Sequence, residues 1–288
     1  LREVLLPFEL THADAVFTPL SALLPLVARV RRLPVVVVNY GLCLIYERAG
    51  RERRALLRAN LRAAHCVVCL GESQRQQIIE QAGLDPARVH TVHLGIDAGW
   101  FAPRGGDGDG TVLAVGKDLA RDYRTLIDAV QPLGVRTHIA GYRRNVTGLD
   151  LPDGVTAGDM PIGELREAYA RAGVVVVPQF RDGYRYGSEG GGLTALLEAM
   201  AMGRPLVVSD RGITRDYVRD GVEALVVPPE DPEALREAIA RVLGDPELAA
   251  RLGAAARARV EEGLTSAHFA AGIAPLLRAA AGTGGAGR

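Results

Sequence analysis

The stretch Gly190-Gly-Gly-Leu-Thr-Ala-Leu-Leu-Glu-Ala-Met-Ala-Met-Gly-Arg-Pro-Leu-Val-Val-Ser209 leads from three consecutive glycines into an apolar helix pattern and ends in a β-branched run. Another β-branched run, Val174-Val-Val-Val177, precedes the glycines, so the order is strand, loop, helix and strand. Parallel strands are joined by helical crossovers of this kind, and strands covered on both faces read as continuous apolar runs. The stretch therefore predicts a βαβ unit in an α/β protein with a parallel sheet.

The same alternation extends along the chain and is interrupted by glycine-rich residues 101–110. We predict two Rossmann-like domains, residues 1–103 and 111–288, joined by a linker at 104–110, with a last helix that could pack back on the first domain. Their ligand is expected in the cleft between them, at the carboxyl ends of the strands. The expected strands are residues 15–18, 35–38, 66–70, 89–93, 112–115, 136–140, 155–157, 174–177, 206–209 and 224–227, and the expected helices are residues 20–31, 51–63, 73–82, 123–130, 162–172, 193–202, 214–219, 232–243, 246–262 and 265–280.

The sequence also allows a prediction for each end of the chain. Residue 1 is leucine and not methionine, and residues 1–9 already read as part of a helix. We therefore expect an upstream portion of the first domain to be missing. Residues 282–288 are rich in glycine and are expected to be disordered.

The composition is that of an ordinary globular protein: 48% of the 288 residues are hydrophobic and 24% are charged. The 34 basic and 34 acidic residues give a formal net charge of zero, which argues against nucleic acid as a partner. No apolar run reaches the ~20 residues of a membrane-spanning helix, and peripheral membrane contact is not evident in the sequence. The absence of a signal peptide and the presence of only three cysteines predict a cytoplasmic protein, in which Cys66-Val-Val-Cys69 serves packing.

The glycines before the helix pattern suggest a binding function. Glycine lets the backbone approach a ligand closely, and a helix start offers unpaired N–H groups that suit phosphate. A loop that needs positive φ angles would look the same, so these residues alone leave both interpretations open. Thr194 and Glu198 lie four residues apart, away from the apolar stripe that begins at Leu193. A carboxylate there suits a pair of sugar hydroxyls or, alternatively, a structural pair with an arginine.

Two cations follow the strand expected at residues 112–115. Lys117 is the only lysine in the chain, the other 33 basic residues being arginine, and Arg121 comes four residues later. Both lie at the carboxyl end of a strand, where they would neutralise a diphosphate. A solvated loop that also contains Asp118 and Asp122 is the alternative.

Part of the opening stretch, Gly192-Leu-Thr-Ala-Leu-Leu-Glu-Ala-Met-Ala-Met-Gly-Arg-Pro-Leu-Val-Val-Ser209, resembles the donor-binding signature of the family 4 glycosyltransferases, which are retaining enzymes with the GT-B fold. The similarity continues through Asp216-Tyr-Val-Arg-Asp-Gly-Val-Glu-Ala-Leu-Val-Val-Pro-Pro-Glu-Asp-Pro232. It also includes Val115-Gly-Lys117 with Arg121-Asp-Tyr123, and His93-Leu-Gly-Ile-Asp97. The resemblance covers residue 90 to the end well and the first part loosely.

The resemblance implies an enzyme whose second domain holds a nucleoside diphosphate sugar. Lys117 and Arg121 match the family's pair of cations on the donor diphosphate, and Glu198 matches the second signature glutamate, which bonds the ribose. Backbone amides from Gly191 to Thr194 would meet the phosphates. The expected catalytic residues are Lys117, Arg121 and Glu189, the expected donor-binding residues are Gly116, Gly190, Gly191, Gly192, Leu193, Thr194 and Glu198, and no metal or other cofactor is expected.

Two positions depart from the family pattern. The family separates its signature glutamates by seven residues, but Gly190 occupies the first of these positions and Glu189 stands one residue earlier. Either the loop bulges and brings Glu189 to the transferred sugar, or that role is lost. In the first domain a histidine often follows the second strand; Tyr40 stands there instead, and His12 is the candidate substitute unless it is structural.

The leading hypothesis is therefore a glycosyltransferase that moves a sugar from the donor to a hydroxyl of a glycan, lipid or small-molecule acceptor, with retention. A second hypothesis is a catalytically idle nucleotide-sugar-binding module, motivated by the irregular glutamate spacing and the absent histidine. A third, ranked lower, is a sugar-nucleotide epimerase, which shares the architecture but needs acid and base groups that the sequence does not locate.

Overall fold

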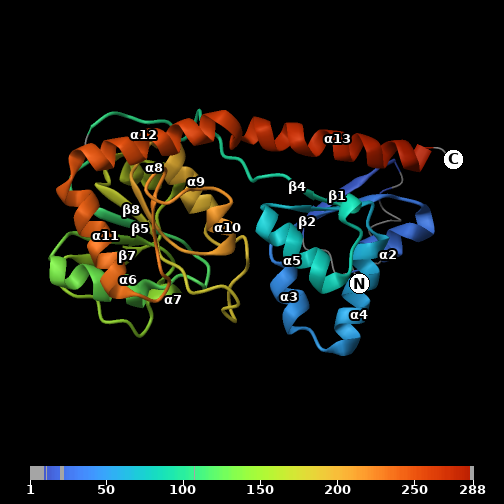
Figure 1. The fold of residues 1–288 in the computed structure, drawn as a ribbon, viewed down its shortest axis with the longest axis horizontal. Helices are drawn as coiled ribbons and strands as arrows, with labels where there is room; N and C mark the ends of the chain where they lie inside the picture. The colour runs from blue at the N-terminus through green and yellow to red at the C-terminus, as the bar shows by residue number, and fades with distance from the viewer. Residues whose placement is uncertain (1–9, 11, 20–22, 107, 286–288) are drawn as a thin grey trace. The chain divides into compact units, whose positions relative to one another are not determined.

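The computed structural model describes residues 10, 12–19, 23–106 and 108–285, which form two α/β units (Figure 1). The first unit comprises Leu1–His93, Ser188–Gly190 and Ala267–Arg288, and the second comprises Leu94–Gly187 and Gly191–Ser266. Each unit has its own parallel sheet, so the predicted fold class of two α/β domains is confirmed. Packing divides the chain after His93, and the predicted domain limits at residues 103 and 111 stay predictions.

The first unit is built on four parallel strands in the order β1-β2-β3-β4. All five residues of β2 are buried, as expected of an inner strand that is covered on both faces. The strands are β1 (Val16–Pro19), β2 (Val35–Asn39), β3 (Cys66–Cys69) and β4 (Val89–Thr91), and the helices are α2 (Leu24–Ala28), α3 (Leu42–Arg48), α4 (Arg51–Ala63), α5 (Glu72–Ala82) and α13 (Ser266–Gly285), with short 3-10 turns at Arg29–Arg31 and Pro86–Arg88.

The cysteines of the first unit are free thiols in its core. Asn39 Nδ2 donates to Cys43 Sγ at 3.3 Å and to Cys69 Sγ at 3.7 Å. Burial raises the pKa of the Cys66 thiol to about 11 and that of Cys69 to about 12, so both stay protonated at neutral pH. Their buried places in β3 agree with the packing role predicted from the sequence.

The second unit has six parallel strands in the order β10-β9-β8-β5-β6-β7. The chain leaves β5 toward β6 and β7, and then returns to β8 on the other side of β5, so the sheet reverses its direction of growth between β5 and β8. The strands are β5 (Val112–Val115), β6 (Thr137–Ala140), β7 (Val155–Gly158), β8 (Val174–Val177), β9 (Leu206–Ser209) and β10 (Leu225–Val227), and the helices are α6 (Tyr123–Val130), α7 (Arg143–Val146), α8 (Ile162–Arg171), α9 (Leu193–Ala201), α10 (Gly212–Arg215), α11 (Pro232–Gly244) and α12 (Pro246–Gly263), with a 3-10 turn at Gln131–Leu133.

Helices cover both faces of this sheet, with α8, α9 and α12 on one side and α6 and α11 on the other (Figure 1). Alternate strand residues such as Val112 and Ala114 join one buried cluster with α6 and α11. Helices α11 and α12 each follow an aspartate N-cap: the carboxylates of Asp231 and Asp245 accept from backbone N–H groups three residues later, at 3.0 and 2.9 Å.

Helix α3 is absent from the sequence prediction, which places a strand at residues 35–38 and the next helix at residues 51–63. Asn39 and Gly41 separate the strand from the helix there: Asn39 Oδ1 accepts from the N–H groups of Gly41 at 3.1 Å and Leu42 at 2.7 Å. A side chain that binds these first N–H groups starts the helix. Helix α10 also differs from the prediction, because it lies at Gly212–Arg215 and not at residues 214–219.

Helix α13 extends beyond the predicted helix at residues 265–280. Residues 282–285 continue it, so the prediction of disorder is wrong for them. Residues 286–288 lie outside the described residues, as does the helix predicted at residues 1–9. Within the described ranges, none of the helices combines the length and the apolar character that a membrane crossing requires.

A close backbone contact fixes α12 on the turn that ends α9, because a Cβ at Gly253 would overlap the carbonyl oxygen of Gly203. We predict that Gly253→Ala lowers the free energy of unfolding by about 1–3 kcal/mol, as overpacking does, measured by urea denaturation. Gly263→Ala in the same helix is the matched control, because nothing lies within 4 Å of its Cβ position. Equal denaturation midpoints for the two variants would contradict this account of the contact.

Candidate functional site

The point where the second sheet reverses its direction of growth brings two loops together. One loop follows β5 and contains Gly116, Lys117 and Arg121, and the other follows β8 and contains Gln179. An isolated antiparallel bridge between Arg121 and Gln179 joins them. Ligands of open parallel sheets bind outside the carboxyl ends of the strands at such a reversal, so this is where a site is expected.

Arg121 is a buried cation at this point. Its side chain is 4% exposed, and its Nε donates to Asp118 Oδ2 at 2.8 Å. A Cβ at Gly116 would overlap the Arg121 guanidinium, so glycine is the residue that makes room for it. Nη1 of Arg121 is buried and has no hydrogen-bond partner among the described residues. A buried donor of this kind needs an acceptor, which an anionic ligand would supply.

Gln179 supplies a second buried donor. Its backbone N–H donates to Ser209 Oγ at 2.8 Å, which fixes the loop after β8. Its Nε2 finds no acceptor in the part of the chain that the structure describes. Gly192 has a φ of 90° and lies so close that a Cβ there would overlap the Gln179 amide. Sequence reasoning missed Gln179; the available signal was a polar residue placed one proline after a buried apolar strand.

The glycine-rich loop ends where α9 begins, as predicted. No side chain of the described residues caps the start of α9 at Gly192, so its first N–H groups remain available for a ligand. Leu193 is buried and Thr194 is exposed, which agrees with the predicted apolar stripe. The carbonyl of Gly191 accepts from Arg211 Nη1 at 3.3 Å.

Glu198 lies in the buried part of α9, where it is 7% exposed. The hydroxyl of Tyr169 on α8, fully buried, donates to Glu198 Oε2 at 2.9 Å. Burial raises the pKa of Glu198, although the Tyr169 hydrogen bond and the positive charge of Arg121 oppose this rise. The hydrogen-bond partner is thus a tyrosine and not an arginine, and the sequence gives no local signal for it.

Lys117 points to a different part of the same strand edge. Its Nζ forms an ion pair with Asp159, which follows β7, and lies 4.8 Å from the centre of the Tyr142 ring, which follows β6. The hydrogen bond to Asp159 raises the pKa of Lys117. Lys117 is exposed and Arg121 is buried, so the two predicted cations lie in different environments. Sequence reasoning missed both Asp159 and Tyr142.

Glu189 and Gly190 belong to the first unit. The Glu189 carboxylate accepts a short hydrogen bond from the backbone N–H of Leu44, in the first turns of α3. A Cβ at Gly190 would meet Leu70 Cδ1 at 3.6 Å and Gln74 Nε2 at 3.7 Å, which are ordinary van der Waals distances. No steric conflict in this structure therefore requires glycine at position 190.

The two first-domain candidates lie near the sheet of the first unit. Tyr40 directly follows β2 and is half-buried, and burial raises its pKa. His12 precedes β1 and is exposed. A role for either residue stays a prediction. In the described ranges, no three histidine, cysteine or acidic side chains come close enough together to hold a metal ion.

Two protein-family models match the chain. One, described as Glycosyl transferases group 1, matches residues 140–259, and the other, described as Glycosyltransferase Family 4, matches residues 1–100. The chain is 31% identical over 207 residues to the D-inositol 3-phosphate glycosyltransferase of Mycolicibacterium paratuberculosis. This match covers 62% of the chain and 44% of the relative, so the chain spans less than half of that relative's length.

Solved structures with the same fold are more distant in sequence. Sucrose-phosphate synthase from Thermosynechococcus elongatus has a TM-score of 0.78 at 23% identity, with 94% of this chain and 74% of that chain covered. HepE of Anabaena, solved in complex with UDP-glucose, has a TM-score of 0.77 at 17% identity, with 96% of this chain and 82% of that chain covered. At these identities the likeness shows the fold.

The raised pKa of Glu198 predicts how stability depends on pH. A carboxyl group whose pKa is higher in the folded protein stabilises the fold at low pH. This contribution is lost as the pH rises from the pKa of the unfolded chain, about 4.3, through the higher pKa of the folded protein. Glutamine at position 198 keeps an acceptor for the Tyr169 hydroxyl and carries no charge. We therefore predict that Glu198→Gln is more stable than the natural protein at about pH 7 and that this advantage disappears near about pH 4.

Urea denaturation at both pH values measures this difference. Glu164→Gln, an exposed glutamate on α8, is the control and should change stability little at either pH. An effect of Glu198→Gln that is the same at both pH values would show that its cause is not the charge.

Proposed function

The chain belongs to the family 4 glycosyltransferases and has their GT-B fold, and from this premise we propose that it transfers a sugar from a nucleoside diphosphate sugar to an acceptor hydroxyl. The donor would bind to the second unit, at the carboxyl ends of β5 and β8. The relatives are inositol-phosphate glycosyltransferases and a neighbour holds UDP-glucose, so a UDP-sugar is the first donor to test.

The observation that carries this proposal is the pair of buried donors at the reversal of the sheet. Arg121 Nη1 and Gln179 Nε2 are both buried without a hydrogen-bond partner in the described part of the chain. Diphosphate oxygens would accept from both, and the uncapped start of α9 would add backbone N–H groups and the positive end of its dipole. Gly192 has no side chain, so a diphosphate could come close to the backbone at the start of α9.

Glu198 would bind the ribose of the donor. Its Oε2 is engaged by Tyr169, which holds the carboxylate in one orientation. The remaining lone pairs would accept from ribose hydroxyls, a match that a glutamate makes well. Because the pKa of Glu198 is raised by burial, a ligand that donates hydrogen bonds would favour its charged form.

The proposed chemistry is mainly electrostatic. As the sugar leaves the donor, negative charge grows on the departing diphosphate, and Arg121 lies preorganised to stabilise it because its position is fixed by burial and by Asp118. Lys117 would add a second positive charge by exchanging Asp159 for a phosphate oxygen. We propose transfer with retention, as in the family, and no metal.

A second candidate function, a binding module that does not transfer sugar, is favoured by one observation. The position of the family's first glutamate is Gly190, and the Glu189 carboxylate accepts from the backbone of Leu44. One oxygen of this carboxylate is thus bound to a helix N–H, and the carboxylate stands one residue before the position of the family's glutamate. The two candidates agree on donor binding and differ on turnover.

Lys117 provides a direct test of the electrostatic role. We predict that Lys117→Ala lowers kcat about 100-fold, as the loss of a preorganised charge-stabilising group does. UDP release from UDP-glucose, with D-inositol 3-phosphate as the first acceptor, measures the rate. Arg136→Ala is the matched control, since Arg136 is an exposed cation of the same unit that pairs with Asp109. Equal turnover in both variants would remove Lys117 from the mechanism.

Gly190 provides the test between the two candidate functions. We predict that the natural protein binds UDP-glucose by calorimetry and releases UDP, and that Gly190→Glu raises kcat about tenfold by restoring the family carboxylate, a gain typical of an added electrostatic contact. Gly190→Ala controls for the backbone, because a Cβ fits there. Binding without UDP release in the natural protein, with release only in Gly190→Glu, would favour the binding module.

A further inference from the structure

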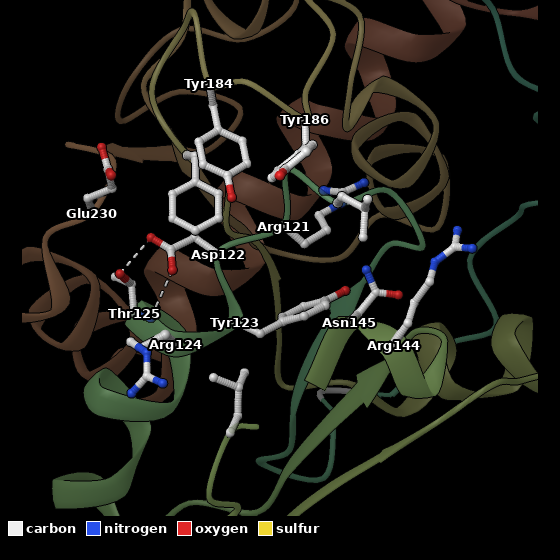
Figure 2. Close-up of a pocket in the computed structure, with 13 residues that line it drawn as sticks. Arg121, Asp122, Tyr123, Arg124, Thr125, Arg144, Asn145, Tyr184, Tyr186 and Glu230 are labelled. Atoms are coloured by element: carbon white, nitrogen blue, oxygen red, sulfur yellow. Dashed lines mark hydrogen bonds between the residues drawn. The ribbon is translucent and has the colours of Figure 1, made fainter. Parts of the chain in front are cut away.

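A pocket of about 580 Å³ opens in the second unit beside the first turn of α6 (Figure 2). Its walls are the start of α6, residues of α7, the loop at residues 180–186, and Glu230. The volume lies within the range of pockets that hold small-molecule ligands. All of its lining residues belong to the second unit, so the pocket is complete within that unit.

The loop that forms the aromatic wall of this pocket is anchored to the rest of the unit. Arg181 forms an ion pair with Glu230 across the pocket rim. The Asp182 carboxylate accepts from Arg211 Nε at 2.9 Å, and also from a backbone N–H at the start of α10. These contacts preform the wall, which lowers the entropy lost when a ligand binds.

Three aromatic rings gather on this wall, in a chain that is only 5% aromatic. Phe180 and Tyr184 stack with ring centres 4.0 Å apart and an angle of 17°, and Tyr186 meets Tyr184 edge-on at 5.9 Å. The side chain of Tyr186 is 52% exposed, and neither tyrosine hydroxyl has a hydrogen-bond partner within the described residues. Flat aromatic surface with unused hydroxyls at its edge suits a ligand that is apolar on one face and polar at its rim.

The polar lining of the pocket is mixed in charge. Three arginines line it, and Arg121 among them is paired with Asp118. Glu230 is paired with Arg181, and Asp122 is 3% exposed with both of its oxygens accepting from Thr125 (Figure 2). Within the described chain Arg124 takes part in no ion pair, and Arg144 donates only one hydrogen bond, to the Lys117 carbonyl at 3.3 Å. The groups that the lining offers to a ligand are therefore the guanidinium donors of Arg124 and Arg144. Hydroxyl oxygens accept from such donors, so a ligand with many hydroxyls and one apolar face matches these donors and the aromatic wall together.

The pocket is separate from most of the proposed donor residues. Arg121 lines it, but Lys117, Gln179 and Glu198 do not. Of these four proposed donor residues, the pocket shares Arg121 alone. The donor contacts proposed above do not use the three aromatic rings or Arg124.

We propose that this pocket is a second carbohydrate site, which binds a neutral saccharide independently of the nucleotide sugar. One sugar ring would lie with its C–H face on Tyr184, and its hydroxyls would accept hydrogen bonds from Arg124 and Arg144. Such a site would hold a part of a glycan that is not the transferred sugar. Its occupation does not depend on turnover, so the proposal stands apart from the proposed enzymatic function.

Saturation-transfer NMR and calorimetry with maltose, cellobiose and sucrose, in the absence of nucleotide, test the site. We expect at least one of these sugars to bind, and Tyr184→Ala to weaken its affinity about fivefold or more, as the loss of an aromatic contact does. Arg144→Ala should weaken it to a similar extent. Arg143→Ala is the matched control, because Arg143 is the neighbouring residue of α7 and does not line the pocket. Urea denaturation of each variant reports whether the protein is still folded.

Three outcomes would overturn the proposal. One is that none of the three sugars binds to the natural protein while urea denaturation shows that it is folded. Another is that a sugar binds equally well to the natural protein and to Tyr184→Ala, which would place it elsewhere. The third is that inorganic phosphate binds in an Arg144-dependent manner and the sugars do not, which would make the pocket an anion site. If Tyr184→Ala does not fold, Tyr184→Phe, which keeps the ring, and Arg144→Ala replace it in the comparison.

Discussion

The burial of one guanidinium is the constraint around which the candidate site is organised. A cation taken out of water must be compensated by charge and hydrogen bonds, and Arg121 finds only part of this compensation in Asp118. Gly116 is needed because any larger residue would overlap Arg121, and the loops after β5 and β8 are joined beside it. Three groups at this point have no acceptor among the described residues: Nη1 of Arg121, Nε2 of Gln179 and the first N–H groups of α9. One anionic ligand would satisfy all three.

The sequence predicted the fold well because the relevant signals are local. Runs such as Val174–Val177 are buried on both faces and therefore apolar without alternation, and Asp-Pro-Glu segments mark helix starts by their own chemistry. The missing helix α3 shows the limit of this approach. Its residues are as apolar as the strand before them, and what separates the two is a side-chain hydrogen bond of Asn39 that has no periodic signature.

The candidate site could be predicted only in part, because its residues act through partners distant in the sequence. Helical periodicity grouped Glu198 with Thr194, but Glu198 is buried and Thr194 is exposed, and the partner of Glu198, Tyr169, lies 29 residues earlier on another helix. Lys117 and its partner Asp159 meet because β5, β6 and β7 end at the same edge of the sheet. The resemblance supplied the roles of these residues, and the structure supplied Gln179 and the contacts of Glu189. The assignment of catalytic and donor-binding residues stays a prediction.

The Lys117–Asp159 pair has a practical consequence for labelling. Lys117 carries the only side-chain amine of this chain, so an amine-directed reagent that reacts with a lysine reports on one known position at the strand edge. The ion pair with Asp159 raises the pKa of this amine and keeps it protonated, which slows its reaction with such a reagent. The amine is nevertheless 42% exposed, so the reagent can reach it. The rate of labelling therefore reports whether Asp159 or another anion is paired with Lys117.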